Sequence, residues 1–240
     1  MLNRILENWL DNASERSYQN VFCQILSAEG YTILHSTRHS ALEYGKDVLA
    51  KSPNGEVCAY QLKGNPGSRL TLSQFTAIQN QLTQLVTQPV IFPGISINSH
   101  KSFLVTNGYI DEEVQRAIDD LNRAFEKQNS IGRPIEVIQR GDFIVWLKEY
   151  GSSLLPDEIK DFENLIKILN ADGKYSFPIE IFHKLLSSIL FLDTESKEIS
   201  AAKLKRNVTS AAVLTEICLR NFSNCKNYYA EITAWVMFCV

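Results

Sequence analysis

Residues 43–63 contain two apolar segments separated by a turn-forming sequence: Glu43-Tyr44-Gly45-Lys46-Asp47-Val48-Leu49-Ala50, then Pro53-Asn54-Gly55, then Val57-Cys58-Ala59-Tyr60-Gln61-Leu62-Lys63. Two apolar runs flanking a turn signal of this kind predict a β-hairpin. Side chains two positions apart on a strand point to the same face, so Gln61 and Lys63 should lie side by side. We expect the Asp47 carboxylate next to them on the adjacent strand.

These three side chains suit the metal-dependent hydrolysis of a phosphodiester. Mg²⁺ prefers oxygen ligands and keeps several waters when it is bound, so Asp47 and Gln61 are candidate metal ligands. A lysine beside them could orient or deprotonate the attacking water and offset the negative charge of the transition state, which is the role expected of Lys63. The alternative is structural, because an aspartate at the start of a strand and a lysine at its end are common in any hairpin.

Asp47 followed by Gln61-Leu62-Lys63 resembles the PD-(D/E)XK nuclease superfamily, in the Q-x-K variant of the Mrr-like type IV restriction endonucleases. The resemblance covers about residues 14–150, because 18–31 resembles that family's first helix and 101–109 its fourth core strand and following turn. It implies an endonuclease that hydrolyses DNA with Mg²⁺ or Mn²⁺, as the effector of a restriction or antiphage defence system. It also implies a metal held by Asp47 and by Gln61, through its side chain or the neighbouring backbone carbonyl.

The chain departs from that family's pattern on the first helix, where the family has a glutamate one step after an aromatic residue. Here Tyr18 is followed by Gln19. Either Gln19 assists catalysis as a neutral group, or Glu15, about one turn earlier, takes the place of the glutamate; Gln19 could also be an ordinary polar residue. Glu43 falls where the family often has an acidic residue, and its alternative is a solvated loop carboxylate.

DNA contacts are expected next to this site. The loop of residues 64–69 directly follows Lys63, and Arg69 in it, together with Lys46, is a candidate contact to the phosphate backbone. The charge balance opposes a broadly basic nucleic-acid binder, because the net charge is −3 and residues 1–150 hold 14 Lys and Arg against 16 Asp and Glu. Phosphate attraction usually supplies most non-specific affinity. Binding would therefore depend on local basic patches, on the metal or on a partner.

The hydrophobic pattern predicts an α/β (α+β) protein: a restriction-endonuclease-like domain over residues 1–150, with a mixed central sheet flanked by helices, and an all-helical domain over 151–240. The boundary is placed at Gly151–Pro156, and Val90–Ile97 is predicted to be a connection because it contains Pro93 and Gly94. The other expected elements are helices at 1–12, 15–29, 73–87, 111–127, 142–150, 159–169, 178–192, 201–222 and 228–240, and strands at 31–34, 103–106 and 135–138.

The remaining features bear on location and partners. Five cysteines without C-x-x-C spacing favour reduced, buried thiols in a cytoplasmic protein, and no apolar run has the roughly 20 residues of a membrane span. The apolar end Trp235–Val240 should be buried against this chain, against a second copy in a homodimer, against a partner subunit or against a continuation of the chain. Two rivals to an autonomous nuclease remain: a catalytically inactive nuclease-fold module for nucleic-acid binding or complex assembly, and a nuclease that cuts only when another subunit docks.

Overall fold

The computed structural model describes residues 2–36, 44–92, 95–97, 99–130, 132–151, 159–190 and 200–239. The chain divides into two compact units, the sheet unit Leu10–Ile144 and a helical unit of Met1–Trp9 and Val145–Val240. This division differs from the predicted boundary in two places. Helix α1 (Leu2–Leu10) belongs to the helical unit up to Trp9, and the second boundary falls inside α5 (Arg140–Gly151).

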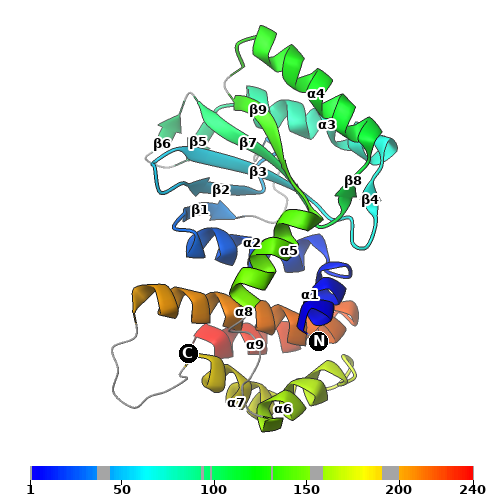
Figure 1. Ribbon diagram of the computed structural model, residues 1–240, viewed down its shortest axis with the longest axis vertical. Coiled ribbons are helices and arrows are strands. Elements are labelled where there is room, and N and C mark those ends of the chain that lie inside the picture. Colours follow the sequence, from blue (N-terminus) through cyan, green and yellow to red (C-terminus); the bar gives the residue numbers. More distant parts are fainter. Residues whose placement is uncertain are drawn as a thin grey trace. The chain divides into compact units, whose positions relative to one another are not determined.

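The sheet unit is built on a five-stranded mixed sheet with the order β1-β2-β3-β7-β9 (Figure 1). Its strands are β1 (Thr32–Ser36), β2 (Val48–Lys51), β3 (Val57–Lys63), β7 (His100–Thr106) and β9 (Gly132–Ile138). The pairs β1–β2 and β2–β3 are antiparallel, whereas β3–β7 and β7–β9 are parallel. The predicted hairpin and the predicted mixed central sheet are therefore confirmed.

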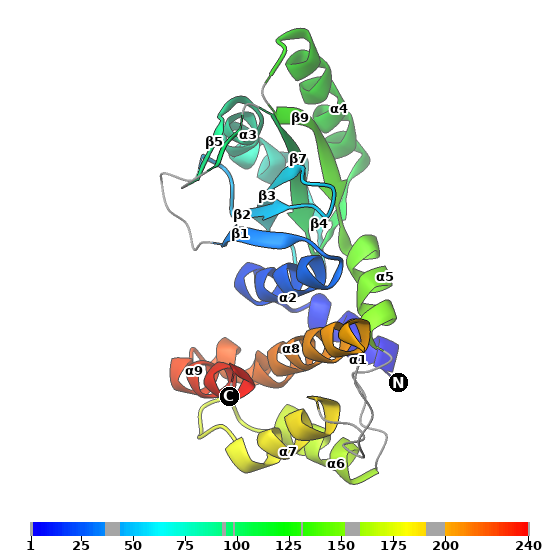
Figure 2. The same ribbon diagram turned by 90° about the vertical axis from the view of Figure 1, so that its left-hand side faces the viewer.

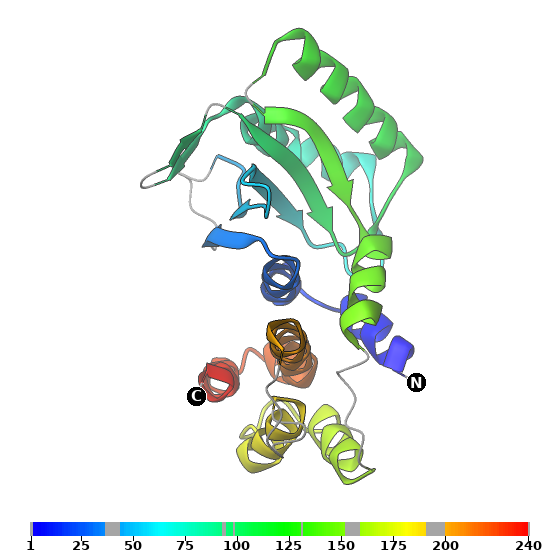
Figure 3. The same ribbon diagram turned by 60° about the vertical axis from the view of Figure 1, so that its left-hand side comes forward.

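Helices cover both faces of this sheet, as predicted. Helix α2 (Glu15–Ala28) packs on one face, and α3 (Leu72–Thr87) and α4 (Glu112–Lys127) pack on the other (Figure 3). On the α2 face, the ring centroids of Phe22 and of Tyr60 in β3 are 5.1 Å apart. Alternation along β3 sends Val57 and Ala59 toward α3 and α4 and sends Tyr60 toward α2. Gln61 and Lys63 lie two and four positions after Ala59, so their side chains point to the same face of the sheet as Ala59, the face that α3 covers.

Two short sheets lie outside the central one. Strands β5 (Val90–Phe92) and β6 (Ile95–Ile97) form a small antiparallel hairpin, so the segment is not a central strand, as predicted, although it is more regular than a plain connection. Strands β4 (Arg69–Leu70) and β8 (Tyr109–Ile110) pair in parallel. They tie together the loops that follow β3 and β7.

Helices form the rest of the described helical unit: α6 (Ile159–Leu169), α7 (Ile179–Leu190), α8 (Ala201–Asn224) and α9 (Tyr228–Cys239) (Figure 2). These bounds agree with the predicted ones to within a few residues. Helix α8 packs against α6, α7 and α9. A cluster of aromatic rings supports the bundle, because Phe177 contacts Phe182 at 5.0 Å and Phe222 of α8 at 5.1 Å.

The predicted burial of the apolar end of the chain is only partly confirmed. Trp235, Met237 and Phe238 are half-buried, whereas Cys239 is exposed and Val236 is 57% exposed. The exposed apolar face of α9 continues upstream with Tyr229 and Ile232, which are 72% and 63% exposed. Covering of this face by a second copy or a partner subunit stays a prediction. No helix in the described part of the chain is long and apolar enough to cross a membrane.

The five cysteines are all free thiols. Cys58 and Cys218 are buried and Cys23 is half-buried, in agreement with the expectation of apolar surroundings. Cys225 and Cys239 are exposed, so the expectation of buried thiols is wrong for these two. Both lie at the ends of helices of the bundle, where the chain is no longer enclosed by its neighbours.

Candidate active site

The β2–β3 hairpin places the carboxylate of Asp47 beside the amide of Gln61. Val48 pairs with Tyr60 in the antiparallel register, and the Asp47 backbone N–H extends the ladder by donating to the Tyr60 carbonyl at 2.8 Å. The next residue of each strand is therefore Asp47 opposite Gln61. Asp47 Oδ2 accepts hydrogen bonds from Gln61 Nε2 at 2.6 Å and from the Leu62 backbone N–H at 2.7 Å. The predicted juxtaposition is confirmed.

The Gln61 amide lies between two oxygens of the hairpin. Its Nε2 also donates to the Leu62 carbonyl at 3.3 Å, so the Asp47 carboxylate and this carbonyl both accept hydrogen bonds from the same NH₂ group. Gln61 is only 3% exposed, and its Oε1 is a buried oxygen without a hydrogen-bond partner among the described residues. Leaving a buried acceptor unpaired costs about 1–3 kcal/mol. The unpaired Oε1 is the other end of the same amide, and turning this amide over would bring Oε1 toward the Asp47 and Leu62 oxygens, where the three could hold a cation.

This donor set fits a hard divalent cation. Carboxylate, carbonyl and amide oxygens are the ligands that Mg²⁺ accepts, and Mn²⁺ takes similar ones. The residues that would hold it are Asp47, Leu62 through its carbonyl, and Gln61 through its amide oxygen. Within the described ranges no group of three His, Cys, Asp or Glu side chains comes together, so the candidate site depends on these mixed oxygen donors. Glu43, the further acidic candidate, lies outside the described residues.

Lys63 stands at the end of β3, two positions after Gln61 and on the same face. Its side chain is half-buried, and in the part of the chain that the structure describes its ammonium takes part in no ion pair or hydrogen bond. Register pairs Lys63 with Thr106 of β7. An ammonium that makes no ion pair with the chain itself can orient a water or a phosphate oxygen.

Helix α2 brings Glu15, rather than Gln19, to the end of β3. Ser14 caps the helix by accepting the Ser17 backbone N–H at 3.2 Å, and Glu15 in the first turn accepts the Gly64 backbone N–H at 2.8 Å. Gln19, one turn later, donates from Nε2 to the Ser36 hydroxyl of β1 at 3.1 Å. Glu15 is therefore the residue of the two that reaches the end of β3, and its role in place of the missing helix glutamate stays a prediction.

Tyr18 is a neighbour of this site that the sequence reasoning treated only as a marker of the helix. Its side chain is fully buried, and its hydroxyl donates to the Val105 carbonyl of β7 at 3.3 Å. Burial raises the pKa of Tyr18 well above its usual value, and the carboxylates of Glu15 and Asp47 raise it further. The phenol therefore remains protonated beside both acids.

A buried polar cluster behind the site was also missed. Asn107 Oδ1 accepts the Asn65 backbone N–H at 2.9 Å, and Asn107 Nδ2 donates to the carbonyls of Leu10 and Ala13 at 2.9 and 3.0 Å. Asn107 directly follows β7 and Asn65 lies two residues after the end of β3. These two strands are parallel neighbours, and their carboxyl ends meet at one edge of the sheet. That position after a strand was the available signal. The cluster fixes the loop that follows Lys63.

The two predicted DNA contacts have different surroundings. Arg69 is exposed, with 70% of its side chain accessible, and pairs with Asp111 at 3.2 Å. Lys46 is only 4% exposed, and its ammonium donates to the carbonyls of Tyr44 at 3.3 Å and Gln84 at 3.5 Å. Burial lowers the pKa of Lys46 from 10.5 to about 8. An ammonium directed at the end of α3 is not available to a phosphate at the surface, so this placement argues against Lys46 as a DNA contact.

Comparisons with known proteins add no relative: no protein-family model, curated protein or solved structure matches the chain.

Proposed function

We propose that the sheet unit, Leu10–Ile144, is a metal-dependent deoxyribonuclease domain with a restriction-endonuclease-like core. The observation that carries the proposal is the Asp47–Gln61 pair, with its unpaired Oε1 and with Lys63 on the same face of β3. The topology supports it, because a helix precedes three antiparallel strands and a further helix leads to a parallel strand next to β3. That is the order of elements which the resemblance to Mrr-like restriction endonucleases implies.

The residues have separate roles in this proposal. Asp47, Gln61 and the Leu62 carbonyl would hold Mg²⁺ or Mn²⁺, and such an ion polarises a phosphate oxygen and lowers the pKa of a bound water. Lys63 would orient the attacking water and offset charge on the phosphate. Glu15 fixes the backbone directly after Lys63 through its 2.8 Å hydrogen bond with the Gly64 N–H. By resemblance, the activity would serve a restriction or antiphage defence system.

A second function is favoured by the same hairpin: a nuclease fold that binds nucleic acid or assembles a complex without cutting. Asp47 Oδ2 already accepts two hydrogen bonds from the chain itself, at 2.6 and 2.7 Å. Asp47 and Gln61 are 7% and 3% exposed, and the helix position of the family's glutamate is held by neutral Gln19. A carboxylate that is satisfied and enclosed in this way can be a structural element of the hairpin.

Cleavage of supercoiled plasmid, linear duplex and single-stranded DNA in Mg²⁺ or Mn²⁺ tests the first function against the second. The variants are Asp47→Asn, which keeps an acceptor for the Leu62 N–H, and Lys63→Ala. Lys51→Ala is the matched control, because Lys51 is an exposed lysine of the same hairpin. Circular dichroism confirms that every variant is folded.

Nuclease function requires that the wild type cleaves, that EDTA stops cleavage, and that both site variants lose at least about a hundredfold in rate, on the scale expected for a positioned acid–base group. The Lys51→Ala control should cleave like the wild type. Affinity for DNA without cleavage in either metal would support the non-catalytic module instead. Equal cleavage by the wild type, Asp47→Asn and Lys63→Ala would remove these residues from the mechanism.

A further inference from the structure

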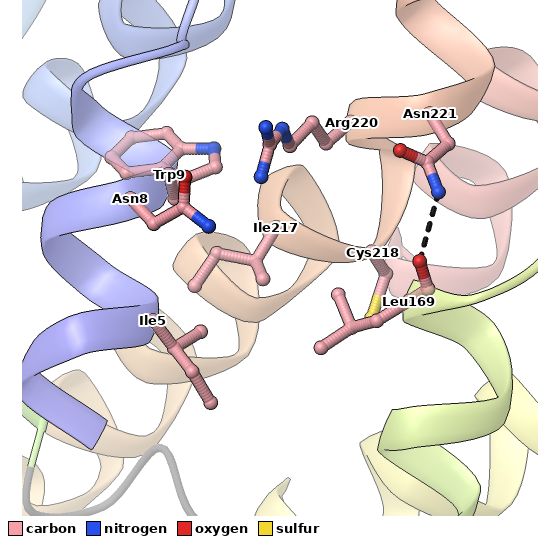
Figure 4. Close-up of a pocket in the computed structure, with 8 residues that line it drawn as sticks. All are labelled: Ile5, Asn8, Trp9, Leu169, Ile217, Cys218, Arg220 and Asn221. Carbon is pink, nitrogen blue, oxygen red and sulfur yellow. Dashed lines mark hydrogen bonds between the residues drawn. The ribbon is translucent and has the colours of Figure 1, made fainter. Parts of the chain in front are cut away.

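A cavity of about 210 Å³ lies within the helical unit and shares no residue with the Asp47–Lys63 site. Helices α1, α6 and α8 form its walls (Figure 4). The lining residues are Ile5, Asn8, Trp9, Leu169, Ile217, Cys218, Arg220 and Asn221.

Two hydrogen-bond donors face each other in this cavity, and no negatively charged residue is among the described lining residues. Figure 4 shows the guanidinium of Arg220 directed toward the indole nitrogen of Trp9. Arg220 Nε is buried without a hydrogen-bond partner, and throughout the described ranges the Arg220 guanidinium makes no ion pair and the Trp9 N–H no hydrogen bond. Arginine and tryptophan side chains can only donate. An acceptor that carries negative charge would satisfy both groups at once.

The remaining walls combine apolar side chains with the amides of Asn8 and Asn221. Ile5 and Ile217 line the cavity, and burial raises the pKa of the Cys218 thiol, so this side chain stays neutral and adds no competing negative charge. Asn221 Nδ2 donates to the carbonyls of Leu169 at 2.8 Å and Ala171 at 3.2 Å. These two hydrogen bonds hold the end of α6 against α8, so the wall exists before any ligand binds.

We propose that this cavity binds a small carboxylate that carries an apolar body about the size of one ring. An apolar cavity of about 150 Å³ accommodates benzene, so the volume here has room for a ring and a carboxylate. Arg220 is the only charged residue among the described lining residues, and one positive charge matches a monoanion better than a phosphate dianion. The guanidinium fork can hold both carboxylate oxygens. The proposal does not depend on the nuclease assignment.

Isothermal titration calorimetry of the full chain with phenylacetate, phenylacetamide and phenyl phosphate tests this site. Phenylacetate and its amide share a shape and differ in charge, so their ratio measures the contribution of the anion. Hydrogen bonds to charged groups contribute enough to expect at least a tenfold preference for the carboxylate. Arg220→Met should weaken phenylacetate binding by tenfold or more and leave the amide unchanged. Arg206→Met is the matched control, because Arg206 is an exposed arginine of the same helix.

Saturable phenylacetate binding with the expected ratio, lost in Arg220→Met and kept in Arg206→Met, supports the proposal. Equal affinity for the amide, binding by Arg220→Met at the wild-type level, or no binding of phenylacetate overturns it. Tighter binding of phenyl phosphate than of phenylacetate overturns the assignment to carboxylates. If circular dichroism shows that Arg220→Met does not fold, the ratio between the two ligands on the wild type decides.

Discussion

Lys46 offers a direct test of how burial in the sheet unit acts on a charge. Its side chain is 4% exposed, and its ammonium donates to the Tyr44 carbonyl and to the Gln84 carbonyl near the end of α3. Burial lowers its pKa from 10.5 to about 8. The perturbation is Lys46→Met, which keeps the length of the side chain and removes the charge. Lys51→Met, on the exposed end of β2, is the matched control.

The size and sign of the effect follow from the two pKa values. One pKa unit corresponds to about 1.4 kcal/mol, so the charged form of Lys46 costs the fold about 3 kcal/mol relative to the neutral form. The folded chain releases the proton above about pH 8, whereas the unfolded chain keeps it up to pH 10.5. Between these values the unfolded state binds more protons, so the free energy of unfolding rises with pH by up to about 1.4 kcal/mol per unit. Below pH 8 this group contributes no pH dependence.

The assay is urea unfolding at several values between pH 7 and pH 10. It is followed by the methyl NMR signals of Leu82 and Leu104, because both side chains are buried in the core of the sheet unit. Thiols and tyrosines also titrate in this range, so the quantity to compare is the free energy of unfolding of the wild type minus that of Lys46→Met. We expect this difference to be constant up to about pH 8 and to rise by about 2 kcal/mol by pH 10.

A difference that stays flat from pH 7 to pH 10, or that falls above pH 8, would refute the reasoning. Either result would mean that the folded chain does not release the Lys46 proton early, and that burial does not act on this ammonium as described. The Lys51→Met control should show no rise, because the Lys51 side chain is exposed and folding does not remove it from water. A rise in the control would assign the effect to the solvent conditions.

Three further predictions concern two residues of the sheet unit and the reactivity of the thiols. Gly45→Ala should lower the free energy of unfolding by about 2 kcal/mol or more in urea titrations, because Gly45 has a φ of +72° and an added Cβ would meet a backbone carbonyl of α3. Gly55→Ala is the control and should cost only about 1 kcal/mol, because Gly55 has a φ of +86° but the nearest atom to an added Cβ is 3.7 Å away. Equal costs for the two variants would contradict the close approach of Gly45 to α3. Asn107→Ala leaves a buried backbone N–H and two carbonyls without their hydrogen-bond partner, so it should lower the free energy of unfolding by about 3 kcal/mol in the same titration. A decrease below about 1 kcal/mol would mean that water replaces the side chain. Burial raises the pKa of the Cys23 thiol to about 11, whereas Cys225 is exposed. At pH 8 a thiol reagent, followed by mass spectrometry, should therefore label Cys23 at least about a hundredfold more slowly than Cys225. Equal labelling rates would refute the effect of burial on Cys23.

Most of the secondary structure and the hairpin part of the candidate site follow from the order of the amino acids alone. Apolar residues at helical or alternating spacing place the helices and the strands of the central sheet within a few residues of their observed bounds. The position of Asp47 beside Gln61 was also predictable, because an antiparallel hairpin brings neighbours in the sequence together through its own turn. These features depend on contacts between residues that are close along the chain.

Contacts between residues far apart in the sequence depend on how the helices and strands pack, and the sequence pattern did not predict them. The hydrogen bond between Glu15 and Gly64 joins positions 49 residues apart, and only the packing of α2 on the sheet selects Glu15 over Gln19 for the end of β3. The sequence predicted Lys46 to be a contact to the DNA backbone at the surface, but α3 packs over this side chain and buries its ammonium. The cavity at Arg220 combines α1 with a helix about two hundred residues later. Periodicity reports which face of an element is buried but not which distant element covers it, and that choice determines both charge and accessibility.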